Sequence, residues 1–230
     1  MTHADAVSAT FIGHVLPGSM FIVWALYWAL QTIRGAGELA TSRSLESNVY
    51  FPAVKVVFAF VGVITEIPGE GWYPQDVMTS WEHVTMYAAV GLTGVVDLLA
   101  LRGRLPPGWT FAAYAAAIAN GGFLFWGHSS HGGVEGLVHA ILALVFFATA
   151  AVGLMEAFRP SADLRWGRIG AQLALGAWFI VGAWIIYLSG WNLADPVREG
   201  WTYMVFSWTA IGVAVVTVGL RLAAGRQTAS

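Results

Sequence analysis

Long apolar segments separated by short polar connections are the feature of this sequence that most constrains its fold. Two examples run from Phe21 to Leu30 and from Leu137 to Leu154. An apolar helix of about 20 residues spans the roughly 30 Å hydrocarbon core of a bilayer. Of the 230 residues, 57% are hydrophobic and only 10% are charged, whereas soluble domains have about one quarter charged residues. The sequence therefore predicts an integral protein of the cell membrane, folded as an all-α bundle.

Seven segments are expected to form membrane-spanning helices of a single domain covering residues 1–230. Their approximate ranges are 11–33, 45–67, 81–101, 107–126, 134–158, 169–188 and 202–222. The second segment is the least regular, because Pro52 must either kink that helix or start it. Pro106-Pro107 is a favourable opening for the fourth.

The distribution of basic residues predicts the orientation. With seven spans, ten of the eleven Lys and Arg residues fall on one side of the membrane, and Arg198 falls on the other. Cytoplasmic loops carry such an excess of basic residues. The N-terminus is therefore expected outside and the C-terminus in the cytoplasm. No small-residue cleavage motif follows the first apolar segment, so this segment is expected to stay in the mature protein.

Composition also excludes several classes of function. The chain has no cysteine, which rules out disulfides, thiolate metal sites and cysteine nucleophiles. The basic residues lie singly at helix ends, a pattern that topology explains and that gives no support for nucleic-acid binding. No run of charged residues crosses the middle of the bilayer, which argues against ion transport. The expected partners are membrane lipids.

The histidines share one side of the predicted topology. His14, His83, His128, His131 and His139 lie at or near the outer ends of their helices, and His3 lies on the outer tail. His128, His131, Glu135 and His139 follow an i, i+3, i+7, i+11 pattern, which places them on one face of a continuous helix. Gly132-Gly133 favours the alternative of a helix-loop-helix in which the same side chains converge.

Imidazole and carboxylate groups that converge from different helices of a bundle are typical of metal sites. Ionisable groups within a membrane are costly, which favours a functional interpretation. We expect a divalent transition metal, with zinc the first choice and copper or iron as alternatives. Glu82, Glu135 and His3 are expected to be solvated rather than coordinating. The predicted ligands centre on His83, His128 and His139, and the full set is His14, Glu66, His83, His128, His131 and His139.

Several sequence motifs resemble those of the transmembrane protein 45 family. The most specific are Gly13-His14-Val15-Leu16-Pro17-Gly18-Ser19 and Trp81-Glu82-His83-Val84-Thr85-Met86-Tyr87. Weaker likenesses are Ile64-Thr65-Glu66, Val96-Asp97, Gly176-Ala177-Trp178-Phe179, and Gly122-Phe123-Leu124-Phe125 followed by His128. The resemblance covers most of the chain in the same order and implies a seven-helix multipass protein, with no settled biochemical activity to carry over.

Six positions match the polar motif residues of that family: His14, Glu66, His83, Asp97, His128 and His139. The chain also departs from the family pattern. It has His128-Ser129-Ser130-His131 in place of a His-x-His, Gly121-Gly122 in place of an acidic residue before the Phe-Leu-Phe run, and Trp208-Thr209 in place of a Trp-His pair. The resemblance therefore implies a site with fewer polar groups than the family pattern.

The leading functional hypothesis is a metal-dependent membrane enzyme that acts on a lipid-like substrate from the extracytoplasmic side. Zinc would suit hydrolysis, with Glu66 or Glu135 as general base, and a redox metal would suit oxidation. One alternative is a haem-binding electron carrier with His83 and His139 as axial ligands. Another is a non-catalytic binding or accessory membrane protein whose histidines sense metal or pH.

The remaining polar residues are given structural interpretations. Asp97 is expected to pair at the interface with Arg102 or Arg104, and Glu156 with Arg159. Asn120 and Gln172 are expected to hydrogen-bond to neighbouring helices. The acidic and aromatic loop at residues 66–80 is expected to lie in the headgroup layer, with a lid over the site as the alternative.

Overall fold

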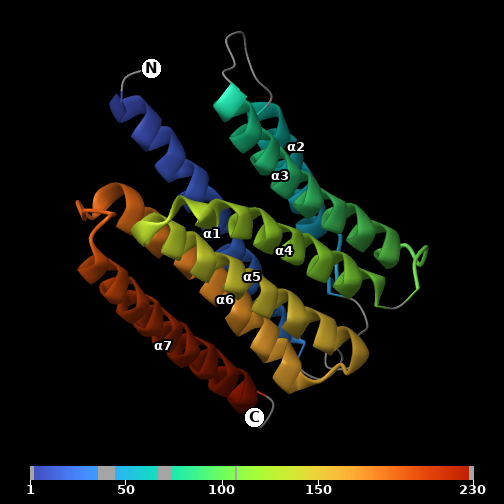
Figure 1. Cartoon of the computed structure of the whole chain (residues 1–230). Helices are drawn as coiled ribbons and strands as arrows, with labels where there is room; N and C mark the ends of the chain where they lie inside the picture. Colours follow the sequence, from blue (N-terminus) through green and yellow to red (C-terminus); the bar gives the residue numbers. More distant parts are fainter. Residues whose placement is uncertain (1–2, 36–44, 67–73, 107, 228–230) are drawn as a thin grey trace.

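The computed structural model describes residues 3–35, 45–66, 74–106 and 108–227, and these residues form a helical bundle without a strand (Figure 1). This confirms the all-α prediction. Neighbouring long helices run in alternating directions, so α1 begins at one end of the bundle and α7 ends at the other (Figure 1). The elements are α1 (His3–Arg34), α2 (Tyr50–Glu66), α3 (Pro74–Leu101), α4 (Trp109–His128), the 3₁₀ turn η1 (Ser129–His131), α5 (Gly133–Phe158), α6 (Ala162–Ala183), the π-helical turn η2 (Trp184–Leu188) and α7 (Pro196–Gln227).

Several helices begin some residues away from the approximate spans expected from the sequence, and for α2 and α6 the structure shows a local cause. The helix α2 begins at Tyr50, so Pro52 lies in its first turn, where the missing N–H costs no intrahelical bond. The helix α6 begins at Ala162, well before the predicted start at residue 169. Its N-cap is Ser161, whose Oγ accepts a hydrogen bond from the Leu164 N–H at 3.2 Å. This cap extends α6 by two turns and brings Arg165 and Arg168 into the helix.

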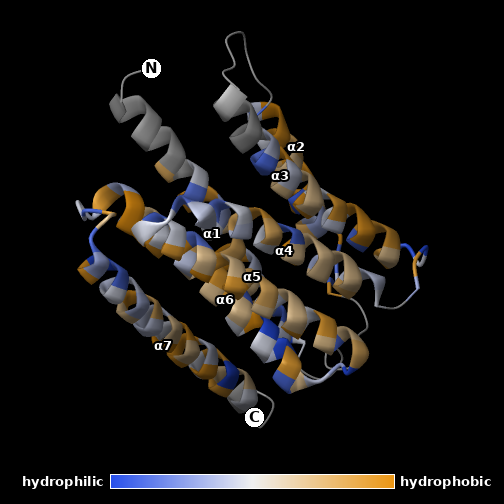
Figure 2. Ribbon diagram, viewed as in Figure 1, coloured by the Kyte–Doolittle hydropathy of each residue, from blue (hydrophilic) through white to orange (hydrophobic). Residues whose placement is uncertain are grey.

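Five helices in the described part of the chain are long and apolar enough to cross a membrane, namely Gly13–Arg34, Trp81–Leu101, Gly133–Phe158, Ala162–Leu188 and Pro196–Gly225. Large apolar side chains are also exposed on the outside of the bundle, for example Val215 on α7 and Phe60 on α2, which are 68% and 66% exposed. Figure 2 shows hydrophobic residues along most of the length of the long helices. Such an apolar exterior suits contact with lipid. The helices α2 and α4 are not among the five, so the count of seven spans stays a prediction.

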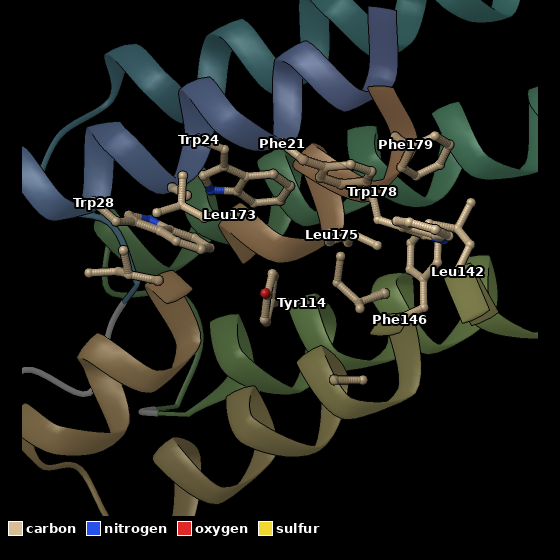
Figure 3. Packing of buried hydrophobic residues seen from close by; sticks show 14 of the residues in the cluster. Phe21, Trp24, Trp28, Tyr114, Leu142, Phe146, Leu173, Leu175, Trp178 and Phe179 are labelled. Carbon is tan, nitrogen blue, oxygen red and sulfur yellow. The ribbon is translucent and has the colours of Figure 1, made fainter. Parts of the chain in front are cut away.

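Aromatic side chains fill the core of the bundle (Figure 3). From α1, Trp24 packs edge-to-face against Tyr114 of α4 at 5.7 Å between ring centroids, and Phe21 packs likewise against Phe146 of α5 at 5.9 Å. Trp178 of α6 is fully buried, and its Nε1 donates to the Val138 carbonyl at 3.1 Å. These contacts join α1, α4, α5 and α6 into one packed body.

The helices α1 and α6 approach each other closely at two glycines. A Cβ on Gly176 would lie 2.6 Å from the Gly18 carbonyl oxygen, which is backbone and cannot rotate away. We therefore expect Gly176→Val to lower the free energy of unfolding by about 1–3 kcal/mol, as overpacking generally does. Thermal unfolding in detergent measures the change. Gly212→Val on α7 is the matched control, because a Cβ there meets nothing within 4 Å; equal losses in both variants would contradict the close approach.

Buried charges form a first cluster around Lys55 of α2. Lys55 Nζ donates to Glu46 Oε1 at 2.8 Å and to Asp97 Oδ2 of α3 at 2.7 Å, and all three side chains are at most 1% exposed. The ammonium also lies 4.2 Å from the ring centroid of Trp24. This cluster, with one cation and two anions, links α2 and α3 to α1.

A second cluster surrounds Glu156 of α5. Its two carboxylate oxygens accept hydrogen bonds from Arg165 Nε at 3.3 Å and Arg168 Nε at 2.6 Å, both on α6. Trp28 joins the clusters, because its Nε1 donates to Glu46 Oε1 at 3.1 Å while the Arg168 guanidinium carbon lies 3.9 Å from its ring centroid. We call the six charged residues the buried ion network: Glu46, Lys55, Asp97, Glu156, Arg165 and Arg168.

This network corrects the ion pairs expected from the sequence. Asp97 pairs with Lys55 rather than with Arg102 or Arg104, and Glu156 pairs with the two α6 arginines rather than with Arg159. The actual partners lie on neighbouring helices at the same end of the bundle.

The side-chain amides of Gln172 and Asn120 were both expected to hydrogen-bond to a neighbouring helix, and only one of them does so among the described residues. The expected interhelical bond of Gln172 is confirmed, since its Oε1 accepts from the Tyr114 hydroxyl at 2.7 Å. Asn120 Nδ2 is buried and has no hydrogen-bond partner among the described residues.

Candidate functional site

A cavity of about 200 Å³ lies at the end of the bundle opposite the buried ion network. Side chains from α1, α3, α4, α5 and the turns η1 and η2 form its wall, and five of them are the histidines of the sequence prediction. The lining residues are His14, Glu82, His83, Met86, Leu124, Phe125, His128, His131, Glu135, His139 and Tyr187. The structure thus brings together groups that are up to 173 residues apart, from His14 to Tyr187.

The turn between α4 and α5 explains how three of these histidines converge. Gly132 and Gly133 have φ of 73° and 58°, a left-handed conformation that favours glycine. The chain reverses there, so α4 and α5 are separate helices joined by η1. A continuous helical face through His128, His131 and His139 is therefore wrong, and the helix-loop-helix alternative is confirmed.

His139 is the most buried imidazole of the cavity. It is 3% exposed, and its Nδ1 is buried without a hydrogen-bond partner in the described part of the chain. Its ring centroid lies 5.5 Å from that of His128 and 5.9 Å from that of His14. Phe125 stacks on its ring at 5.8 Å. Because a buried polar atom normally has a partner, the unsatisfied nitrogen points to a ligand or water in the cavity.

His128 is held by a backbone contact on one side and a carboxylate on the other. Its Nδ1 is 3.1 Å from the Leu124 carbonyl oxygen, and its Nε2 is 3.1 Å from Glu82 Oε2. An Nδ1–H that donates to the carbonyl leaves Nε2 as the nitrogen that faces Glu82. Glu82 is 21% exposed at this contact and lines the cavity, a partner that the sequence did not predict for it.

The remaining predicted residues divide between the cavity wall and its surroundings. Glu66 lies 3.2 Å from His83 Nδ1 through its Oε1 but does not line the cavity, whereas His83, His131 and Glu135 do. Residues 67–73 of the loop interpreted as a headgroup segment or a lid, including Trp72 and Tyr73, lie outside the described residues, and nothing is described of the His3 side chain.

Tyr187 is a lining residue that sequence analysis missed. It belongs to the π-helical turn η2, in which the Ser189 N–H bonds to the Trp184 carbonyl five residues back at 2.8 Å. π-Helical turns inside α-helices occur frequently at functional sites. The wider turn places the Tyr187 ring edge-to-face with His14 at 5.5 Å. No periodicity or motif in the sequence marks this turn.

The described residues contain no group of three or more His, Asp or Glu side chains already arranged to hold a metal ion. Two separations in the cavity can be compared with those of a zinc site. With Zn–N bonds of about 2.1 Å in tetrahedral geometry, two ligand atoms stand about 3.4 Å apart and two imidazole centroids about 5.2 Å apart. The His128–Glu82 contact is 3.1 Å and the His128–His139 centroid separation is 5.5 Å.

Two comparisons with known proteins find similar sequences, and the name of one relative describes a transmembrane protein. The profile of a family described as a family of unknown function (DUF716) matches residues 107–195, which include the α4–α5 turn, His128, His139 and Tyr187. Transmembrane epididymal protein 1A of Mus musculus is 26% identical over 249 residues, covering 91% of this chain and 79% of the mouse protein. No solved structure matches the chain.

The apolar helices and the transmembrane relative together show that this chain is a membrane-embedded multipass protein. The likeness to a family of unknown function brings no activity with it. The narrower resemblance to the transmembrane protein 45 family stays a prediction.

Proposed function

We propose that this multipass membrane protein binds a divalent transition metal ion in the histidine cavity and uses it to hydrolyse a lipid-like substrate. The observation that carries the proposal is His139, a buried imidazole on the cavity wall with an unsatisfied Nδ1, whose ring centroid lies 5.9 and 5.5 Å from those of His14 and His128. Ionisable groups gathered inside a membrane protein are costly and mark functional sites.

The proposed topology has seven spans, with α2 and α4 crossing beside the five long apolar helices. The positive-inside rule then places the N-terminus and the histidine cavity on the extracytoplasmic side. Arg34, Arg102, Arg104 and Arg159 support this orientation, because they lie at the helix ends opposite the cavity. A site on the outer side would meet substrates of the outer leaflet.

His128, His139 and Glu82 are the ligands that the geometry favours. The His128–Glu82 separation fits two ligands of one ion, and the Leu124 carbonyl would orient the His128 ring in the way that metal-bound imidazoles require. His14, whose ring centroid lies 5.9 Å from that of His139, would be a further ligand. Two imidazoles and a carboxylate are an established ligand set for hydrolytic zinc.

A metal ion in such a set activates water and polarises a carbonyl oxygen. The carboxylate of Glu135, on the cavity wall, would accept the proton that the nucleophile loses. Glu66 would not touch the metal or the substrate. Its contact with His83 Nδ1 would fix the orientation of the His83 ring. Glu66 would therefore position His83 rather than act as a ligand or base.

Metal content of the detergent-purified protein tests the proposal. We expect near-stoichiometric zinc, copper or iron by elemental mass spectrometry in the wild type, and at least a ten-fold lower content in His128→Ala and His139→Ala. His3→Ala is the matched control, since His3 is left out of the predicted site. Absence of metal from the wild type after reconstitution with each ion would refute the metal site.

The cavity volume argues against the alternative of a haem-binding electron carrier. A volume of about 200 Å³ is below the roughly 300–1,000 Å³ of pockets that hold drug-sized ligands, so a single ion with a small polar group fits better than a macrocycle. An absorption spectrum of the same samples is decisive, because haem gives an intense band near the blue end of the visible range. Metal binding without turnover would instead favour the accessory protein.

A further inference from the structure

An apolar groove lies between α6 and α7, on the half of the bundle that carries the buried ion network. Its volume is about 460 Å³, more than that of the histidine cavity, and it follows the outside of the bundle where α7 runs beside α6 (Figure 1). The lining residues include Gly167, Gly170 and Ala174 of α6 and Val213, Thr217 and Val218 of α7. None of the residues that line the histidine cavity takes part in this groove.

The wall of the groove offers little to water. The two helices touch at Gly170, where a Cβ would lie 3.1 Å from Thr217 Oγ1. The Thr217 hydroxyl donates to the Val213 carbonyl of its own helix at 2.8 Å, so its hydrogen is already used. Apart from this hydroxyl and an ion pair at one end, the lining side chains are those of glycine, alanine, valine and tryptophan. Such a surface favours a hydrocarbon chain over ordered water.

The dimensions of the groove fit one acyl chain. Asp163 and Ala174 are both lining residues and stand eleven residues apart, about 16 Å along α6 at 1.5 Å per residue. This is about half of the roughly 30 Å hydrocarbon core, the depth of one leaflet. A methylene group takes roughly the volume of a water molecule, about 30 Å³, so the groove of about 460 Å³ has room for about 15 methylenes.

An exposed ion pair stands at the polar end of the groove. Arg221 Nη2 of α7 contacts Asp163 Oδ1 of α6, and both side chains line the groove and are more than half exposed. A guanidinium binds phosphate oxygens through parallel hydrogen bonds, and a carboxylate accepts hydrogen bonds from a primary ammonium. The pair therefore complements both charges of a zwitterionic headgroup. The nearby cations of α6, Arg165 and Arg168, are already paired with Glu156.

We propose that this groove, hereafter the lipid groove, binds one phospholipid with an ethanolamine headgroup. One acyl chain lies between α6 and α7, Arg221 holds the phosphate, and Asp163 accepts from the primary ammonium. A choline headgroup has no N–H to donate, and an anionic headgroup without the ammonium meets the repulsion of Asp163, so both bind more weakly. The site goes beyond the proposed metal chemistry and does not depend on it.

Native mass spectrometry of the delipidated full chain in detergent tests the lipid groove. The probes are phosphatidylethanolamine, phosphatidylcholine and phosphatidylglycerol with the same palmitoyl and oleoyl chains, each titrated alone. We expect the first bound lipid to have a Kd about five-fold lower for phosphatidylethanolamine than for the other two, as one exposed charged contact allows. Arg221→Gln should weaken phosphatidylethanolamine by about the same factor, and Asp163→Asn should abolish its preference over phosphatidylglycerol. Both variants should fold, because an exposed ion pair contributes little to stability.

A variant that fills the groove tests where the acyl chain lies. Ala171→Phe, on a lining residue of α6, should weaken binding of all three lipids. Val215→Phe is the matched control, because Val215 is exposed on α7 and does not line the groove.

Equal affinity of the wild type for the three lipids would mean that only unselective lipid surrounds the bundle, and would overturn the inference. Binding of phosphatidylethanolamine that is unchanged in Arg221→Gln and Asp163→Asn would overturn it as well, including the case in which Ala171→Phe fails to fold. Metal content of the same samples reports separately on the histidine cavity, so either proposal can fail while the other stands.

Discussion

Lys55→Met is expected to lower the free energy of unfolding by about 3–5 kcal/mol, one of the two largest effects that we predict for a single substitution. Lys55 holds Glu46 and Asp97 at 2.8 and 2.7 Å, and its side chain is 0% exposed. Methionine fills a similar volume without charge, so two carboxylates would remain buried without their cation. Removal of one partner from a buried ion pair is costly for this reason.

Unfolding in a denaturing detergent, followed by tryptophan fluorescence, measures this effect. Arg198→Met is the matched control, because the Arg198–Asp195 contact is long, at 3.9 Å, and its side chains are 41% and 35% exposed. It should cost less than about 1 kcal/mol. The triple variant Glu46→Gln, Lys55→Met and Asp97→Asn should recover most of the loss, since no uncompensated charge is left. A Lys55→Met protein as stable as the wild type would show that the two carboxylates are not both charged.

The sequence predicted the elements of the fold better than the contacts between them. Apolar segments and breakers located all the long helices, because lipid and backbone chemistry act locally on each segment. The pairing of Asp97 failed because reading along the chain favours neighbours such as Arg102, whereas the real partner, Lys55, is 42 residues away. Such a pair can be predicted only when the packing of the two helices, and their relative position along the bundle, is known.

In the candidate site, too, the sequence predicted which end of the bundle the residues occupy better than it predicted their contacts. The topology predicted that five histidines lie at the same end of the bundle. The structure places all five on the wall of one cavity: His14, His83, His128, His131 and His139. The role of Glu82 did not follow, because its contact with His128 depends on the rotation of α3 against α4. Tyr187 could not be predicted at all, since a π-helical turn shifts the helical register without a marker in the sequence.

The buried ion network and the candidate site act on the same helix. Glu82 and Asp97 lie on α3, 15 residues and therefore about 22 Å apart. The Lys55–Asp97 bond fixes the position of α3 along its axis relative to α2. At the other end of α3, the Glu82–His128 contact depends on that position. The network thus helps to hold Glu82 where metal binding would need it.

Glu156→Gln is the second substitution with an expected loss of about 3–5 kcal/mol in the free energy of unfolding. Its carboxylate is 0% exposed and accepts from Arg165 and Arg168, so the amide would leave two buried guanidinium groups without an anion. The same unfolding assay measures the loss. Asp163→Asn is the matched control, because Asp163 pairs with Arg221 while 77% exposed, and such a pair contributes less than about 1 kcal/mol.

Combining Lys55→Met with Glu156→Gln tests whether the two clusters act as one network. In the wild type the Lys55 cluster has one excess negative charge and the Glu156 cluster one excess positive charge, with Trp28 in contact with both. Each single substitution enlarges the excess on one side, and the double variant enlarges both with opposite sign. Attraction across Trp28 should then make the double variant less destabilised than the sum of the single losses, by about 0.5–3 kcal/mol. If the losses in the free energy of unfolding are additive, the two clusters do not interact across Trp28, and each stabilises its own pair of helices independently.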